Sequence, residues 1–90
     1  MDTAENPSLP RRVDGLEVHE VEDGFVIYQD GSSRVHCLNH TAAMVFEFVD
    51  GARSAETIAS LLARVFGLDA APMAETEACI EQLRVEGVLR

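Results

Sequence analysis

Three residues near the middle of the chain, His36, Cys37 and His40, are of the types that bind metal ions or take part in nucleophilic catalysis. Imidazole and thiolate groups are common zinc ligands, and a thiol activated by an imidazole is a nucleophile. Residues 34–38 alternate as in a β-strand, however, and adjacent strand residues point to opposite faces. Without a bulge, His36 and Cys37 therefore cannot converge on one ion or act as a nucleophile and base. We expect no metal site here.

Other signs of catalysis are lacking in the sequence. It has no glycine-rich phosphate loop. His40, in the first turn of an expected helix, is interpreted as a neutral surface residue. The acidic residues near the C-terminus are spaced as on a solvated helix face; they are Glu75, Glu77, Glu81 and Glu86. We expect a protein that is not an enzyme and that needs no cofactor.

The charge of the chain limits its partners. The formal net charge is −9, and all seven basic residues are arginine. A domain this acidic repels a phosphate backbone, so nucleic acid is not an expected partner. A basic peptide or a basic protein surface is attracted instead.

Size and composition indicate one small folded domain. The chain has 90 residues, of which 47% are apolar. No apolar run is long enough to cross a membrane, and the acidic N-terminus is unlike a signal peptide. We therefore expect no membrane partner and a cytoplasmic location. In such a reducing compartment Cys37 and Cys79 are expected to be buried free thiols.

The first half of the chain predicts a three-stranded antiparallel meander. Residues 16–19 alternate as in a strand with one wet face. The pair Asp23-Gly24 is typical of a two-residue hairpin turn. Residues 25–29 begin with four consecutive apolar residues, which favours a central strand buried on both faces. A turn at residues 30–33 leads into the third strand, residues 34–38, with Val35 and Cys37 on one face and Arg34, His36 and Leu38 on the other.

The first helix is expected over residues 40–50. Asn39 is a good N-cap, and Gly51 stands where a helix-terminating glycine belongs. Apolar side chains surround the helix almost completely, so it must be covered on several sides. They are Ala42, Ala43, Met44, Val45, Phe46, Phe48 and Val49.

Two further helices are indicated by their caps and apolar stripes. Ser54 is expected to cap the second helix and Gly67 to end it, with a stripe of Ile58, Leu61, Leu62 and Val65. Asp69 is expected to cap the third, with Pro72 in its first turn and Gly87 as its end. The stripe of this helix is Met73, Thr76, Ile80 and Leu83, after which Val88 and Leu89 return to the core.

These elements predict an α+β domain over residues 13–90, in which three strands precede three helices in an arrangement like a winged helix. Residues 1–12 contain Pro7 and Pro10 and show no periodicity, which is typical of a flexible tail.

The order of motifs resembles the PqqD-like family, the modules also called RiPP recognition elements. The strand runs into Leu38-Asn39-His40-Thr41-Ala42, an apolar helix follows, Asp50-Gly51 precedes Ser54, and the closing helix ends in Gly87-Val88-Leu89. The resemblance implies a peptide chaperone that binds the leader peptide of a ribosomally made precursor. It also implies a partner enzyme that modifies the precursor, such as a radical-SAM maturase, a cyclase or a leader peptidase.

The resemblance also places the site: the leader peptide adds beside the third strand and lies in the groove between that strand and the third helix. The candidate peptide-binding residues are Arg34, Val35, His36, Cys37 and Leu38 on the strand, and Cys79, Ile80, Leu83 and Glu86 on the helix. Ile80 and Leu83 belong to the core stripe, whereas Cys79 and Glu86 lie on one flank of it. Spacing does not determine which flank faces the strand.

Two other functions remain open. A winged-helix regulator could have a similar fold, but a DNA reader needs a basic recognition helix, and here Arg84 stands against four glutamates. A structural subunit could instead dock its apolar first helix into a larger enzyme.

Overall fold

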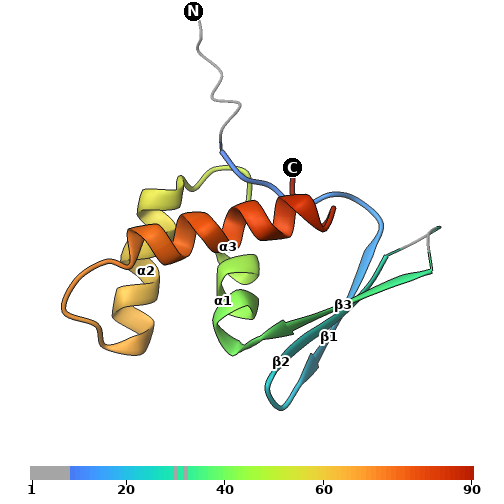
Figure 1. Cartoon of the computed structure of the whole chain (residues 1–90), viewed down its shortest axis with the longest axis horizontal. Coiled ribbons are helices and arrows are strands. Elements are labelled where there is room, and N and C mark those ends of the chain that lie inside the picture. Colours follow the sequence, from blue (N-terminus) through green and yellow to red (C-terminus); the bar gives the residue numbers. More distant parts are fainter. Residues whose placement is uncertain (1–8, 30, 32) are drawn as a thin grey trace, which may run out of the picture.

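A sheet of three strands leads into three helices in the computed structural model of the chain, which describes residues 9–29, 31 and 33–90 (Figure 1). The elements are β1 (Leu16–Val21), β2 (Gly24–Gln29), β3 (Arg34–Asn39), α1 (His40–Phe48), α2 (Ala55–Phe66) and α3 (Met73–Val85). This order confirms the predicted α+β class.

The sheet is an antiparallel meander in the order β1-β2-β3, so β1 and β3 are its edge strands. The first turn differs from the prediction by one residue: Gly24 pairs with Val21 and begins β2, which leaves Glu22 and Asp23 as the loop. A side chain at position 24 would collide with the carbonyl oxygen of Leu38. Glycine is therefore required there by the close approach of β3.

The helices pack against one face of the sheet only. In β2, Ile27 is fully buried among helix residues, whereas Tyr28 on the opposite face is 46% exposed. The prediction that β2 is buried on both faces is therefore wrong. A continuous apolar run is compatible with two covering layers, but the helices of residues 9–29, 31 and 33–90 cover only one face.

Helix α1 lies at the centre of the domain and contacts β2, β3, α2 and α3. Val45, Phe46 and Val49 are almost completely buried. The expected cover on several sides is thus provided within the chain. Asn39 caps the helix, its Oδ1 accepting from the Ala42 amide at 2.9 Å. The helix ends at Phe48, earlier than the predicted residue 50.

The predicted N-cap is confirmed for α2 and wrong for α3. The Ser54 hydroxyl accepts from the Thr57 amide at 3.1 Å, and Gly67 ends α2 in the left-handed conformation. Asp69 does not cap α3, which begins at Met73 after Pro72 and has no side-chain cap. Val65, assigned to the buried stripe of α2, is 50% exposed.

The segment before β1 is tied to the C-terminus and to α1. Pro10 is buried, and its carbonyl oxygen accepts from the Gly51 amide at 3.0 Å. Arg12 forms a β-bridge with Leu89. Residues 9–12, which the sequence placed in a flexible tail, are therefore part of the packed domain; residues 1–8 lie outside the described residues.

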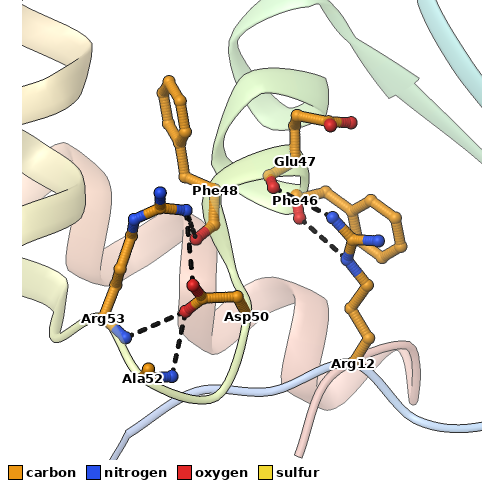
Figure 2. A network of polar contacts seen from close by, with 7 residues as sticks. All are labelled: Arg12, Phe46, Glu47, Phe48, Asp50, Ala52 and Arg53. Atoms are coloured by element: carbon orange, nitrogen blue, oxygen red, sulfur yellow. Dashed lines mark hydrogen bonds and ion pairs between the residues drawn. The ribbon is translucent and has the colours of Figure 1, made fainter.

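Arg12 also closes the C-terminal end of α1 (Figure 2). Its Nε donates to the Phe46 carbonyl at 3.2 Å and its Nη2 to the Glu47 carbonyl at 2.9 Å. The guanidinium lies 4.7 Å from the centre of the Phe46 ring.

In the turn after α1, the carboxylate of Asp50 accepts from the Ala52 and Arg53 amides. The hydrogen bond from Ala52 is the main cause of the lowered pKa of Asp50.

Replacing Arg12 by alanine is expected to lower the free energy of unfolding by about 1–2 kcal/mol, because two carbonyl groups of α1 lose a charged donor and Phe46 loses its cation. Urea unfolding followed by circular dichroism measures this. Arg11→Ala is the matched control, since it removes the same charge from the next residue. Equal losses for the two variants would contradict the specific role of Arg12.

Candidate functional site

The outer edge of β3 is the first component of the site. Within the described residues β3 pairs with β2 only, so half of its backbone donors and acceptors face outward. Strand β1 has a similar outer edge, but the two edges have different surroundings. Glu86, directly after α3, reaches His36 on the helix-facing side of β3.

A buried polar cluster joins β2, β3 and the end of α3. His36 is only 6% exposed, and its Nε2 lies 3.1 Å from Oε1 of Gln29. The Gln29 amide nitrogen donates to the Gly87 carbonyl at 3.1 Å. His36 Nδ1 lies 3.5 Å from Oε1 of Glu86. Since Gln29 presents an oxygen, His36 donates to it through Nε2, and Nδ1, which faces the Glu86 carboxylate, pairs with it when the imidazole is protonated.

This cluster shows which side chain at the C-terminal end of α3 points toward β3. Glu86 faces β3 through His36, and Cys79 lies on the same flank. Burial raises the pKa of the Cys79 thiol, and the nearby charge of Glu86 adds to the effect. On the other side of α3, Glu77 and Arg84 line a hollow that also contacts Pro10. Of the Cys79–Glu86 flank, which spacing alone could not orient, Glu86 lies beside β3 at its contact with His36.

The remaining candidate residues lie in three different environments. Leu38, Ile80 and Leu83 have at most 6% exposure and belong to the hydrophobic core, so their side chains are not available to a ligand in this conformation. Val35 and Cys37 are exposed on the sheet face that points away from the helices. Arg34, on the helix-facing side, is exposed.

The cysteines also differ from the prediction. Both thiols are free, but Cys37 is exposed and Cys79 is half-buried, so neither is the buried thiol that the sequence suggested. The alternation of β3 gives no indication of which face the helices cover.

Gln29 is the site residue that the sequence reasoning missed. It ends an apolar strand and shares a face with Phe25 and Ile27. A polar residue at a core-facing position needs a hydrogen-bond partner, and this requirement was the available indication of its role.

A separate apolar hollow of about 440 Å³ lies among the three helices, near the N-terminal end of α3. Thr76 lines it and is 1% exposed; its hydroxyl has no hydrogen-bond partner among the described residues. The full lining is Thr41, Val45, Leu62, Phe66, Leu68, Pro72, Glu75 and Thr76. It is distinct from the contact between His36 and Glu86, which lies at the opposite end of α3.

Two other kinds of feature are absent from the part of the chain that the structure describes. No group of three or more His, Cys, Asp or Glu side chains is placed to hold a metal ion. No helix there has the length and apolar character to cross a membrane.

The fold and the edge beside α3 define a small α+β domain with one strand edge bordered by a helix. The family model described as Coenzyme PQQ synthesis protein D (PqqD) matches residues 24–89, and the chain belongs to this family. This confirms the resemblance seen in the sequence. Comparison with curated proteins and with solved structures gave no match. At the level of the family, the match indicates a small accessory protein that interacts with a precursor peptide and its modifying enzyme.

The two thiols are expected to react at different rates. At neutral pH, iodoacetamide should alkylate Cys37 about tenfold faster than Cys79 or more, because Cys37 is exposed whereas burial raises the pKa of Cys79 and lowers its thiolate fraction. Peptide mass spectrometry at timed intervals measures both rates in one sample. Faster reaction at Cys79 would contradict the orientation of α3.

Proposed function

We propose that the chain binds the leader peptide of a ribosomally made precursor along the outer edge of β3 and presents the precursor to a modifying enzyme. A radical-SAM maturase, a cyclase or a leader peptidase is the partner class, and the cytoplasm is the proposed location. The observation that carries the proposal is the position of the Cys79–Glu86 flank of α3 beside the edge strand of a sheet in a PqqD family member.

The physical basis is β-augmentation. A peptide strand that pairs with β3 satisfies the outward backbone groups of β3 and needs no particular sequence to do so. Its alternate side chains then enter the space between β3 and α3. His36 and Gln29 close the inner side of this space, with Glu86 beside them. Selectivity comes from these side chains, because the backbone pairing is common to all sequences.

Charge adds a second element of selectivity. The domain carries a net charge of −9, and Glu86 places one carboxylate at the groove, with 35% of its side chain exposed. We expect the leader to carry Lys or Arg near its binding segment. Raising the salt concentration should weaken binding, because this attraction is screened over about 8–10 Å at moderate ionic strength.

Selection from a phage-displayed library of random peptides tests the binding mode without knowledge of the natural precursor. Peptides of about 12 residues are long enough to span one strand and its flanks. Enriched peptides should shift the backbone amide resonances of β3 and α3 on titration. Shifts concentrated in β1 or α2, or a failure to enrich any peptide, would overturn the proposal.

The winged-helix regulator gains no support from the structure. The third helix exposes Glu75, Glu77 and Glu81, so the surface it offers to a duplex is acidic. A structural subunit without a peptide role can be distinguished by the same experiment. It would bind an enzyme, but the peptide library would give no peptide that shifts the amide resonances of β3.

A further inference from the structure

The face of the sheet that points away from the helices has an apolar surface at the β3 edge. Val35 is 52% exposed and Tyr28 is 46% exposed, and both lie on this face together with Cys37. Two rows of paired residues cross the sheet here. One consists of Glu17, Tyr28 and Val35, and the other of His19, Val26 and Cys37.

The two ends of these rows differ. At the β1 end, His19 Nε2 donates to Oε2 of Glu17 at 2.7 Å, and the His19 ring packs edge-on against the ring of Tyr28. At the β3 end, each row stops at an exposed side chain, Val35 or Cys37, because β3 has no strand on its outer side within the described residues. The rows are therefore open for extension at β3.

We propose that the leader peptide is read on both faces of the sheet, and that Val35 and Cys37 select apolar or β-branched leader residues on the face away from the helices. This inference rests on the proposed addition of a strand to β3. Given that addition, successive leader residues alternate between the groove and the open face. A leader side chain directly opposite Val35 or Cys37 then has its Cβ about 4.5–5.5 Å away.

The two-sided reading changes the expected motif. A peptide read only in the groove needs an apolar residue at every second position. A peptide read on both faces needs a short continuous run of apolar residues, favouring Val, Ile, Thr and aromatic types on the open face. The basic residue expected near Glu86 then flanks this run.

The two native cysteines test the alternation directly, because Cys37 lies on the open face and Cys79 on the flank of α3 that is close to Glu86. Cysteine is placed at each position of an enriched peptide in turn, and the disulfide adducts that form in a buffer of oxidised and reduced glutathione, with oxidised glutathione as the oxidant, are identified by mass spectrometry. Positions that couple to Cys37 should alternate with positions that couple to Cys79. Because the two thiols differ in reactivity, the peptide positions are ranked separately for each thiol. Cys37→Ser should abolish only the adducts with Cys37.

A substitution pair tests the selectivity. Val35→Thr keeps the shape and strand preference of the side chain but makes it polar, and it should lower peptide affinity about fourfold, the effect of roughly one buried methyl group. Val21→Thr is the matched control, because Val21 lies on the same face at the far edge strand and is 46% exposed. The loss should disappear for a peptide with alanine at the position facing Val35.

The outcomes separate this inference from the proposed function. Peptides that shift β3 and α3 resonances but couple to both cysteines from the same positions, or lose no affinity with Val35→Thr, overturn the two-sided reading and leave strand addition intact. Peptides that do not shift β3 resonances overturn both.

Discussion

Replacing Leu83 by alanine is expected to lower the free energy of unfolding by about 2–5 kcal/mol, the range for deleting a buried leucine side chain. Leu83 is 2% exposed and belongs to the core shared by the sheet and all three helices. Its truncation leaves a cavity between α3 and the rest of the core. The chain has only 90 residues, so a loss of this size removes a large part of its stability.

Val85→Ala is the matched control for this prediction. Val85 lies two residues further along the same helix but is 70% exposed, so its truncation should change stability by less than about 0.5 kcal/mol. Urea unfolding of the two variants, followed by circular dichroism, makes the comparison. Similar losses for both variants would show that the facing of α3 is wrong.

Local rules were enough to predict most of the elements. The caps at Asn39 and Ser54 and the end of α2 at Gly67 follow from side-chain and backbone preferences of single residues. The helical period placed Ile80 and Leu83 in the core of α3, and both are buried. These features depend on near neighbours in the chain, and therefore they can be read from the sequence.

Features that depend on distant segments could not be predicted in this way. The outward face of β2 is exposed because, in the described part of the chain, no second layer of helices covers Tyr28. Residues 9–12 look irregular by themselves, yet they are ordered by hydrogen bonds from Gly51 and Arg90, which lie far along the chain. Asp69 has the right type for a cap, but α3 begins four residues later, after Pro72.

The candidate site shows the same division. Spacing placed Cys79 and Glu86 on one flank of α3, which is a local property. The direction in which that flank points is set by packing, and it is visible only in the contact between Glu86 and His36. The role of each β3 residue likewise depends on which sheet face the helices cover, so His36 is buried and Val35 is exposed.

Glu86→Arg is expected to weaken the binding of a basic selected peptide about tenfold or more, equivalent to about 1.4 kcal/mol, and to leave the melting temperature nearly unchanged. The substitution replaces an attractive charge at the groove by a repulsive one. The fold should tolerate it because the Glu86 side chain is partly exposed and lies at the C-terminal end of α3, where a cation is favourable. A neutral His36 can accept from the new guanidinium through Nδ1.

Glu81→Arg separates the local effect from the change in net charge. It alters the charge of the same helix by the same amount, but Glu81 lines the hollow beside Leu9 and Pro10, on the other side of α3 from His36. Its effect on peptide affinity should stay within about threefold, the range of a distant screened charge. Isothermal titration of one basic peptide against both variants, with thermal melts of each, makes the comparison. Equal weakening by the two substitutions would mean that the domain attracts the peptide through its overall charge, and Glu86 would then have no specific place in the groove.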